Sequence, residues 1–546
     1  MNLSSDIIFV MRKRFLFLGI IILIAYHNAI FGQFISDDKS LPAVMNHFGD
    51  WKYMFVHNMS IISTGLSYLI YRINGWQPFY FHVVNIILHI INVWLVYVLV
   101  KELCHCGGAG RPKQSVPIAF MTAAIFAIHP ILTEAVSWVS GQSYLLYTIF
   151  ILLSLLLFIK KRYWLSLVIF ILALLSSVKA VILPLILIVY CWSFARKKLR
   201  YVIPFAAVVL IPLLIIIVPN IGPRMIQSQA KPDFIMPFVS FATYIRLLFW
   251  PDNLTFFHVN PLTTGDYIFS FSAAGLYLLV LLYFWRKDKI VFFWLMFFLI
   301  GLLPVITPLP IASFVAERYV YLAAIGMFYV LARILLWIDV LLTRRHDFSH
   351  LISIFSFTLI IVLLMIRTIE RNNDWQTNYS FWRATAISTP FSFQAHDSYG
   401  MALVDKKLYS DAIAELTKAL ILKPDYALGH QNLAYAYQLS GRLSEAINEY
   451  NRALYLYQSV ATSTDNISKI YQDLGGAYLS LEQYDNALVY AQKALRLEPA
   501  NADLMTNVGI VYFKLGNKEN ARKYFTAAIK MIPNFSKANY WLQQLK

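Results

Sequence analysis

Long apolar stretches separated by short polar turns occupy the first two thirds of the chain. A helix needs about 20 predominantly apolar residues to cross a lipid bilayer, and twelve of these stretches reach or approach that length. We expect a helix at each of them. The twelve stretches are residues 14–33, 78–100, 117–130, 142–159, 163–177, 180–194, 201–219, 237–250, 267–285, 290–309, 318–341 and 350–367.

Short basic clusters between these stretches predict how the chain is oriented, because Lys and Arg concentrate in cytoplasmic loops. With the amino terminus inside, the clusters at 160–162 and 196–200 are cytoplasmic. The clusters at 286–289 and 344–345 are cytoplasmic only if one intervening stretch does not cross. Residues 237–250 form the shortest candidate for this exception, so we expect them to be re-entrant or interfacial. The prediction is then eleven spans, with the carboxyl end outside the cytoplasm.

A different period begins near residue 390. Dipeptides whose second residue is Gly or Ala recur at spacings of 34, 41 and 34 residues, and alanines follow these dipeptides at fixed offsets. This is the tetratricopeptide pattern, in which small residues allow two helices to pack closely. We expect four repeats and a capping helix, with about seven inserted residues in the long spacing. The pairs are Tyr399-Gly400, Leu433-Ala434, Leu474-Gly475 and Val508-Gly509.

Together the two periods predict an all-α protein. We expect a polytopic membrane helical bundle of about eleven transmembrane helices in residues 1–370, a linker in 371–390 and a tetratricopeptide α-solenoid in 391–546. The mean hydropathy of +0.59 excludes a single soluble domain. The formal charge of +17 sits largely in the clusters between spans, so we expect no nucleic-acid partner.

Cysteine is scarce, so a disulfide framework is excluded. A metal site at Cys104-His105-Cys106 is disfavoured against an ordinary cytoplasmic loop, because one short cluster supplies too few well-spaced ligands. We therefore expect no metal site there.

The second apolar stretch carries a polar stripe, His82, Asn85, His89 and Asn92, at spacings of three, four and three residues. This spacing places all four on one face of a helix. Hydrogen bonding between helices is favoured over contact with a ligand.

Three cations lie at the predicted outer boundary of the membrane: Lys179, Arg246 in the re-entrant segment, and Arg318. A cation in that position suits a lipid phosphate. For Lys179, snorkelling to the surface is an equal alternative. Glu317 next to Arg318 is a candidate ion-pair partner.

The loop at 129–142 brings His129 and Glu134 to the same outer side. A buried structural turn is the favoured interpretation of His129. His82, His89, His129 and Glu134 are thus the candidates for lining a site at this boundary.

Two adjacent acids, Asp37 and Asp38, follow the first apolar stretch directly. Neighbouring residues do not share a helix face, so one can reach a substrate while the other holds a backbone amide or a cation. A carboxylate in a partly dry site can act as a general base. A helix cap or a solvated loop is the alternative. A divalent cation beside the pair is a further option.

Several motifs in consistent order resemble one family along essentially the whole chain. They are the acidic pair, the stripe from His82 to His89, the loop 129–142, "VAERYVYL" at 315–322, "RNNDWQTN" at 371–378 and the repeats. The chain resembles the transmembrane, tetratricopeptide-repeat-containing O-mannosyltransferase-like proteins. They belong with the protein O-mannosyltransferases, in the wider class of polyprenyl-phosphate-sugar-dependent glycosyltransferases of GT-C fold.

The resemblance implies transfer of a sugar, mannose or another hexose, from a polyprenyl-phosphate donor to an acceptor outside the cytoplasm. It implies inversion, with Asp37 or Asp38 as the base. Lys179 matches a lysine that relatives follow with Glu-Gln-Gly, where this chain reads Ala-Val-Ile. Leu132 stands in place of a second histidine and Gln142 in place of an arginine.

The absence of a phosphate-binding glycine loop and of a DxD motif fits a lipid donor rather than a nucleotide sugar. We expect the acceptor to be a protein Ser or Thr hydroxyl, with the polypeptide bound by the repeats. The alternative is a non-catalytic membrane-anchored scaffold; a transporter is disfavoured because the acids lie at the outer boundary. Short loops favour a prokaryotic cytoplasmic membrane with the repeats outside over an endoplasmic reticulum membrane.

Overall fold

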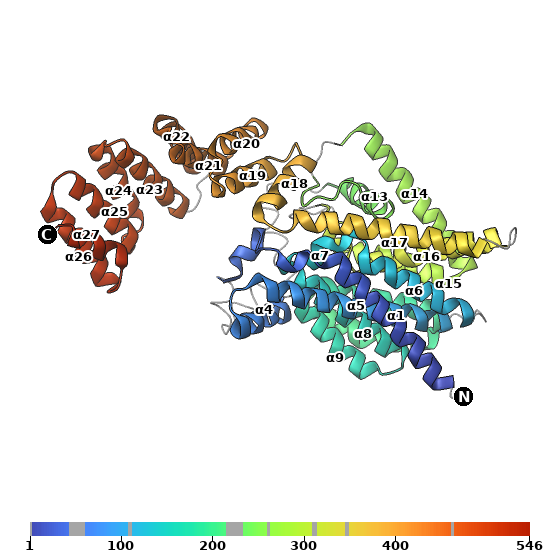
Figure 1. Cartoon of the computed structure of the whole chain (residues 1–546). Coiled ribbons are helices and arrows are strands. Elements are labelled where there is room, and N and C mark those ends of the chain that lie inside the picture. The colour runs from blue at the N-terminus through green and yellow to red at the C-terminus, as the bar shows by residue number, and fades with distance from the viewer. Residues whose placement is uncertain are drawn as a thin grey trace. The chain divides into compact units, whose positions relative to one another are not determined.

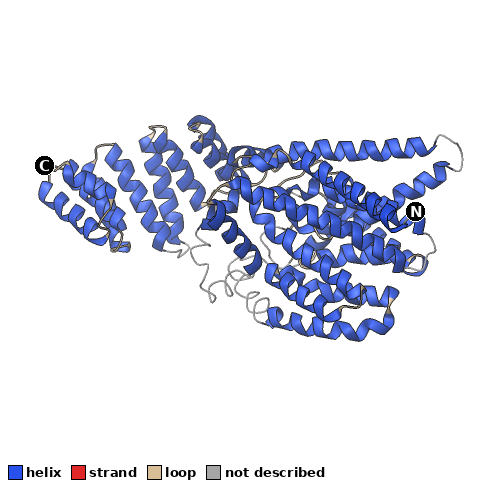
Figure 2. Ribbon diagram, turned by 60° about the horizontal axis from the view of Figure 1, so that its bottom comes forward, coloured by secondary structure: helices blue, strands red, loops and turns tan. Residues whose placement is uncertain are grey.

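The computed structural model describes residues 3–42, 60–106, 112–214, 233–258, 262–307, 314–343, 349–459 and 464–545. Every regular element in these ranges is a helix, and they contain no strand (Figure 2). The chain forms two compact units, Met1–Ser388 and Thr389–Lys546. The all-α prediction is confirmed.

The first unit has a helix in each of the twelve apolar stretches, although parts of 201–219 and 290–309 lie outside the described residues. Short 3-10 helices (η) join several of them, and α4 is an additional helix that the apolar pattern did not predict. The α-helices are α1 (Leu3–Tyr26), α4 (Ile61–Asn74), α5 (Pro78–Cys106), α6 (Pro112–Ile128), α7 (Thr133–Ser137), α8 (Gln142–Ile159), α9 (Tyr163–Ser176), α10 (Leu183–Phe194), α11 (Ile203–Pro212), α13 (Met236–Phe249), α14 (Thr264–Lys287), α15 (Lys289–Leu302), α16 (Ala324–Thr343), α17 (Ser349–Asp374) and α18 (Asn378–Ser388).

By length and composition, four helical segments among the described residues can cross a membrane: Pro78–His105, Val139–Ile159, Thr264–Lys287 and Ala324–Leu341. Two bent helix pairs raise the number to six if each is one span. Further apolar helices, α13 among them, are shorter. The eleven-span count and the re-entrant assignment of 237–250 therefore stay predictions.

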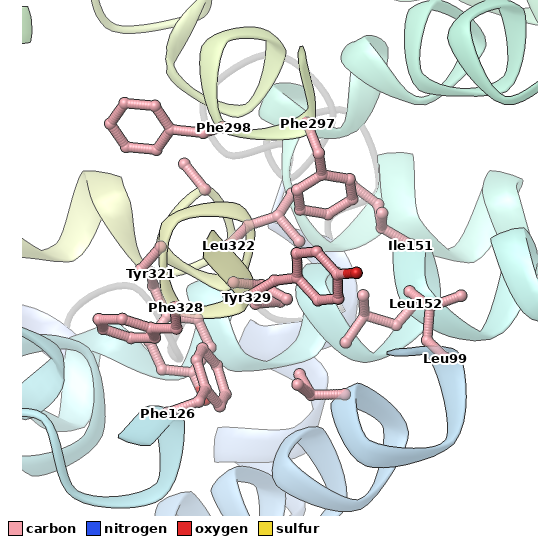
Figure 3. Packing of buried hydrophobic residues seen from close by; sticks show 14 of the residues in the cluster. Leu99, Phe126, Ile151, Leu152, Phe297, Phe298, Tyr321, Leu322, Phe328 and Tyr329 are labelled. Carbon is pink, nitrogen blue, oxygen red and sulfur yellow. The ribbon is translucent and has the colours of Figure 1, made fainter. Parts of the chain in front are cut away.

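The core of the first unit is a continuous apolar cluster between the long helices. Phe126 of α6, Leu152 of α8 and Phe297 of α15 are buried in it, together with Phe328 and Tyr329 of α16 (Figure 3). Leu and Phe interdigitate here as in the interior of a soluble protein. The acidic turn packs on a separate apolar cluster, in which Phe34 and Leu41 lie against Ile70, Phe81 and Val139.

The start of α1 and the turn between α14 and α15 lie at one end of the bundle (Figure 1). That turn carries Arg286 and Lys287. The short helix η2 (Ser36–Ser40) lies at the opposite end (Figure 1). This is the arrangement that the predicted orientation requires of the basic turn and the acidic pair.

Residues 371–390, expected as a linker, contain the end of α17 and all of α18. Trp375, Phe381 and Trp382 are buried, and all three rings pack against Phe256. The aromatic side chains make this segment part of the first unit, whose boundary is at Ser388.

The second unit is a series of antiparallel helix pairs followed by one more helix. The predicted four repeats and capping helix are present, and the 41-residue spacing is taken up partly by longer helices on either side of residues 460–463, which lie outside the described ranges. Alanines at the predicted offsets, such as Ala446 and Ala453, are fully buried between the helices. The helices are α19 (Phe393–Asp405), α20 (Tyr409–Leu422), α21 (Ala427–Leu439), α22 (Leu443–Ser459), α23 (Thr464–Ser480), α24 (Tyr484–Leu497), α25 (Ala502–Lys514), α26 (Lys518–Met531) and α27 (Ser536–Gln543).

Candidate active site

The two adjacent aspartates have different surroundings in η2. Asp38 is buried, whereas Asp37 is exposed. Asp38 Oδ1 accepts hydrogen bonds from the backbone N–H of Ser140 at 2.8 Å and from its hydroxyl at 2.6 Å, and Oδ2 accepts one from Ile35 N–H at 3.3 Å. Asp38 therefore ties η2 to the loop 129–142 and leaves Asp37 facing outward.

The backbone that leads into the pair is strained. Ser36 has φ of +50°, in the left-handed region that side-chain-bearing residues rarely adopt. The hydrogen bonds of Asp38 hold this turn in place, because one bond joins Asp38 to Ile35, before Ser36, and another joins it to Ser140 in the loop 129–142. Strain of this kind persists only where the surrounding contacts impose it, and it concentrates at functional sites.

The cation Arg318 lies in η8 (Glu317–Val320), which precedes α16. Its guanidinium is paired with the fully buried Glu134 of α7, and its backbone N–H donates to the second Glu134 oxygen at 2.8 Å. Its guanidinium carbon lies 4.9 Å from the ring centre of Tyr319 and 5.2 Å from those of Trp138 and Phe256. The positive charge is thus held between one carboxylate and three aromatic faces.

Glu317 does not pair with its neighbour Arg318. Its carboxylate accepts hydrogen bonds from Arg371 of α17 at 3.2 and 3.4 Å, and Arg371 also bonds Asp374 at 2.9 Å. Sequence reasoning missed the role of Arg371. The available signal was an arginine inside the "RNNDWQTN" motif directly after the apolar stretch 350–367, where a charge needs a buried partner.

Lys179 lies in η5 (Val178–Ile182), the turn between α9 and α10. Its ammonium donates to the Tyr144 hydroxyl at 3.1 Å and lies 4.8 Å from the Tyr144 ring centre and 5.4 Å from that of Tyr319. Tyr319 is also one of the rings beside Arg318. Two of the three predicted phosphate-binding cations therefore share an aromatic wall.

Residues 138–140 connect the cations to the acidic pair. Trp138 provides a face for Arg318, and Ser140, two residues later, holds Asp38. Hence the loop 129–142 joins the acidic turn to Arg318, and Tyr319 joins Arg318 to Lys179, although these residues come from widely separated parts of the sequence.

Arg246 is set apart from these two cations. It lies in the last turn of α13 and is exposed. Its helix is nevertheless anchored beside η8, because the Tyr244 hydroxyl donates to Ala316 O and accepts from Ala316 N–H, both at 3.1 Å.

Most of the polar stripe on α5 makes hydrogen bonds between segments. Asn85 donates to the carbonyls of Val136 and Trp138, and Asn92 donates to that of Leu145. Both ring nitrogens of His89 are also engaged, one with the Tyr321 hydroxyl at 2.7 Å and one with Ala127 O at 3.0 Å. These three residues position the loop 129–142 and the start of α8.

The other two candidate histidines are buried. His129 is bonded through Nε2 to Leu248 O at 3.1 Å, and its Nδ1 accepts from Ile131 N–H, so its ring caps the turn that follows it. The nitrogens of His82 have no hydrogen bond of standard geometry to the residues that the structure describes. His82 lies beside Gly32, four residues before η2, since a Cβ on Gly32 would sit 3.1 Å from its Nε2.

The end of α17 is hydrogen-bonded to the segments that carry the acidic turn and the loop 129–142. Asn372 accepts from the Ser137 hydroxyl at 2.6 Å and donates to Ala25 O at 2.8 Å, and Gln33 N–H donates to Gln376 O at 2.8 Å. The "RNNDWQTN" motif thereby ties the first helix to the loop 129–142.

Two of the three departures from the family pattern, at Leu132 and Gln142, are accommodated in the protein interior. Leu132 is fully buried in the apolar core. Gln142 is also buried, and it accepts a hydrogen bond from Ser67 at 3.0 Å and donates to Asn85 at 3.4 Å. Neither position supplies a charge to the site.

The acidic pair fits a divalent cation poorly. Both carboxylate oxygens of Asp38 already accept hydrogen bonds, which leaves Asp37 as the exposed ligand. In the described part of the chain, no group of three or more His, Cys, Asp or Glu side chains could hold a metal ion.

Two comparisons describe the repeats. Family models of the tetratricopeptide repeat match residues 426–500 and 473–534. Solved structures align with low global scores: a crystal structure of MamA covers 29% of this chain and 82% of its own, with 24% identity and a TM-score of 0.25. A thermophilic repeat protein of Thermus thermophilus covers 34% and 95%, with 15% identity and a TM-score of 0.27.

Curated relatives extend the similarity into the membrane unit. Protein O-mannosyl-transferase F38B6.6 of Caenorhabditis elegans is 27% identical over 388 residues, which is 67% of this chain and 54% of that protein. Protein O-mannosyl-transferase TMTC3 of Mus musculus is 22% identical over 443 residues, 70% of this chain and 46% of that protein. The chain spans about half the length of these relatives. The resemblance drawn from the motifs is confirmed: the chain is a relative of the transmembrane, tetratricopeptide-repeat-containing protein O-mannosyl-transferases.

Proposed function

We propose that this protein is a membrane glycosyltransferase. It transfers a hexose such as mannose from a polyprenyl-phosphate donor to a Ser or Thr hydroxyl of an acceptor polypeptide, on the extracytoplasmic side of a prokaryotic cytoplasmic membrane. The proposal is supported by the names of the relatives, which are protein O-mannosyl-transferases, and by the chemistry of the site.

The observation that carries the proposal is the connection through residues 138–140. An exposed carboxylate, Asp37, stands next to a buried one that is bonded to Ser140. Two residues before Ser140, the ring of Trp138 contacts the cation Arg318. A base and a cation held by one rigid loop suit a reaction in which a proton leaves one group while negative charge grows on another.

Asp37 is the general base in this proposal, and Asp38 is a positioning residue. Asp37 has an exposed carboxylate that an acceptor hydroxyl can reach, whereas both oxygens of Asp38 are occupied by protein donors. As the hydroxyl oxygen forms its bond to the anomeric carbon, its proton passes to Asp37. The bond from that carbon to the phosphate oxygen breaks on the opposite face, so the configuration inverts and polyprenyl phosphate leaves.

Lys179 and Arg318 receive the departing phosphate. The helix α9 has 14 residues, about 21 Å at 1.5 Å per residue, and the hydrocarbon layer is about 30 Å thick. A turn at the end of so short a helix stops below the membrane surface, which favours a buried phosphate contact for Lys179 over snorkelling. Arg246, exposed on α13, is assigned to an outer phosphate oxygen.

The tetratricopeptide unit binds the acceptor polypeptide in this scheme, because stacked helix pairs present an extended surface to an extended chain. His82 and Glu134 act indirectly: His82 supports the chain at Gly32 that leads into the acidic turn, and Glu134 holds Arg318. His89 and His129 shape the walls through the hydrogen bonds described above.

The test is transfer by the full chain, in proteoliposomes, from a polyprenyl-phosphate-linked radiolabelled hexose to a Ser/Thr-containing peptide. Asp37→Asn lowers the transfer rate by about 10²- to 10⁴-fold, the contribution of a general base. The thermal midpoint is unchanged, because Asp37 is exposed. Asp405→Asn, at another exposed aspartate, is the matched control and leaves transfer intact.

Full transfer activity in Asp37→Asn would refute the assignment of Asp37 as the general base. No transfer by the wild type with any hexosyl lipid, combined with rescue of a deletion strain by residues 390–546 on an unrelated membrane helix, would support the scaffold alternative.

A further inference from the structure

Two basic clusters in the first unit are not used by the proposed chemistry. One lies in the turn that joins α8 to α9, and the other lies in η6 (Arg196–Val202), which follows α10. The helix α8 begins at the loop 129–142 and has 18 residues, about 27 Å at 1.5 Å per residue. Its turn is therefore far from the acidic pair, at the end that the predicted orientation places in the cytoplasm. The seven cations are Lys160, Lys161, Arg162, Arg196, Lys197, Lys198 and Arg200.

Stacked tyrosines hold the two clusters side by side. Tyr163 directly follows the first cluster and Tyr201 directly follows the second, and their rings stack with centres 4.1 Å apart and planes inclined by 10°. Arg200 donates to the Tyr201 hydroxyl at 3.0 Å, and its guanidinium carbon lies 4.9 Å from the centre of that ring. Clusters that are distant in the sequence thus form one basic surface.

The tyrosine pair rests on the apolar core of the unit. The Tyr163 ring packs edge-on against Phe158 with centres 5.1 Å apart, and Phe158 packs against Phe205 at 5.8 Å. Both phenylalanines are buried. The backbone of the turn is also held, because Lys161 N–H donates to Phe158 O at 3.0 Å. The cations therefore stand on a rigid support.

Little negative charge compensates this surface. Six of the seven cations are exposed, and Lys198 is half-buried. Among the residues that the structure describes, a carboxylate pairs with Lys160 alone of the seven, and that pair is long, at 3.9 Å to Glu102. Lys and Arg bind phosphate oxygens strongly through charge-assisted hydrogen bonds. The charge of the surface is thus complementary to a phosphate-bearing ligand.

Exposed apolar side chains border the cations. Trp164 is 79% exposed, Ile203 is 67% exposed and Leu199, inside the second cluster, is 49% exposed. Trp192 and Trp285, near the ends of α10 and α14, pack at 5.6 Å and are also partly exposed. Tryptophan concentrates at the level of the lipid headgroups. A soluble phosphate compound would leave these apolar side chains uncovered, whereas a phospholipid covers them with its acyl chains.

We infer that the two clusters bind the headgroup of an anionic phospholipid of the cytoplasmic leaflet, with a preference for a headgroup that carries two phosphates. One phosphate lies at the turn 160–162 and the other at η6, on either side of the stacked tyrosines. The acyl chains extend past Trp164 and Ile203 into the bilayer. This inference is independent of the proposed function, because it uses neither the acidic pair nor Lys179.

The test measures lipid binding to the delipidated full chain in micelles of an uncharged detergent, by native mass spectrometry. The probes are cardiolipin, which has two phosphates, phosphatidylglycerol, which has one, and the zwitterionic phosphatidylcholine. At equal phosphate concentration, cardiolipin should bind about tenfold more tightly than phosphatidylglycerol, and phosphatidylcholine more weakly than both. Millimolar inorganic phosphate should leave the bound cardiolipin in place, because it cannot cover the apolar border.

Two triple variants each remove three exposed cations. The first acts on η6 and should weaken cardiolipin binding by at least about tenfold. The second acts on α25 and α26 in the other unit, and as the matched control it should bind like the wild type. The variants are Arg196→Gln with Lys197→Gln and Arg200→Gln, and Lys514→Gln with Lys518→Gln and Arg522→Gln.

A second pair of variants leaves every charge in place, so membrane insertion keeps its basic signals. Tyr201→Leu removes the stacked ring and should reduce the preference for cardiolipin over phosphatidylglycerol from about tenfold to less than about threefold. Tyr201→Phe keeps the ring, loses only the hydroxyl that Arg200 contacts, and should retain the preference. An unchanged thermal midpoint shows that a variant is folded.

Three results overturn the inference. They are equal binding of all three lipids by the wild type, wild-type cardiolipin affinity in the folded η6 triple variant, and displacement of cardiolipin by millimolar inorganic phosphate. The last result would indicate a site for a free anion. The wild-type lipid series decides the question even if a variant fails to fold.

Discussion

Removal of the charge of Glu134 is the sharpest test of how the site is built. Glu134 is fully buried and Arg318 is 9% exposed, so neither charge has access to bulk water when its partner is lost. Glu317 cannot replace Glu134, because it is engaged by Arg371. Glu134→Gln keeps an oxygen for the backbone N–H of Arg318 but removes the compensating charge.

The magnitude follows from the burial of the pair. Breaking a buried ion pair by removing one partner costs about 3–5 kcal/mol, because it leaves an uncompensated charge. The ring faces of Trp138, Phe256 and Tyr319 remain beside Arg318, and their cation–π contacts offset about 1–2 kcal/mol of this loss of stability. We therefore expect Glu134→Gln to lower the free energy of unfolding by about 2–4 kcal/mol. Arg318→Met should cost about 3–5 kcal/mol, because it strands Glu134 without such rings.

The assay is denaturant unfolding in mixed micelles, with the two single variants and the double variant in one cycle. The double variant contains no buried charge at this pair and should lie within about 2 kcal/mol of the wild type. It should nevertheless lack sugar transfer, since the proposed phosphate cation is gone. Glu445→Gln breaks the exposed pair with Arg442 and serves as a control without measurable effect. Additive losses in the double variant would refute the idea that the two charges compensate each other.

Ser140→Ala removes the hydrogen bond from the Ser140 hydroxyl to Asp38. It should lower the free energy of unfolding by about 1.5–3 kcal/mol and also lower kcat. Thermal denaturation and transfer kinetics measure the two effects, and an unchanged thermal midpoint would contradict the first. Each ring nitrogen of His430 has an acceptor beside it: the Glu449 carboxylate at 2.6 Å and Pro424 O at 3.0 Å. Burial lowers the pKa of His430, but these hydrogen bonds outweigh burial and hold the pKa above its usual value of 6.5. The stabilisation that these hydrogen bonds give to the charged ring is complete below the unfolded-state pKa of about 6.5 and is lost as the pH rises through the folded-state pKa. The thermal midpoint of the wild type should therefore fall as the pH rises over this range, and that of His430→Gln should fall less. A Cβ on Gly476 of α23 would meet a single described atom within 4 Å, Gln438 Nε2 at 3.7 Å. Gly476→Ala should therefore raise the free energy of unfolding by about 0.5–1 kcal/mol, the helix preference of alanine over glycine, and an unchanged or lower midpoint would refute an open position.

Much of the fold could be predicted because its signals are local. Apolar stretches become helices wherever they occur, and the spacing of Gly400 and Gly509 with alanines marks the repeats. The acids and cations were found as charges near membrane helices, where an unpaired charge is expensive. The aromatic segment around Trp375 was expected as a linker, because no local pattern says which surface its rings cover.

The partners of the charged groups could not be predicted in the same way. Glu317 was an attractive partner for Arg318 by adjacency, but the structure pairs Arg318 with Glu134, which is 184 residues away in sequence. The distinction between Asp37 and Asp38 depends likewise on Ser140, 102 residues further on.

The helices, the repeats and the candidate residues could be read from the chain alone, because helical hydrogen bonds and side-chain periodicity join residues that are near in sequence. Tertiary structure alone decided which acid is buried, which charges compensate each other and which basic clusters lie side by side. The physical reason is that desolvation and ion pairing depend on what surrounds a group in space, and helices distant in sequence supply those surroundings.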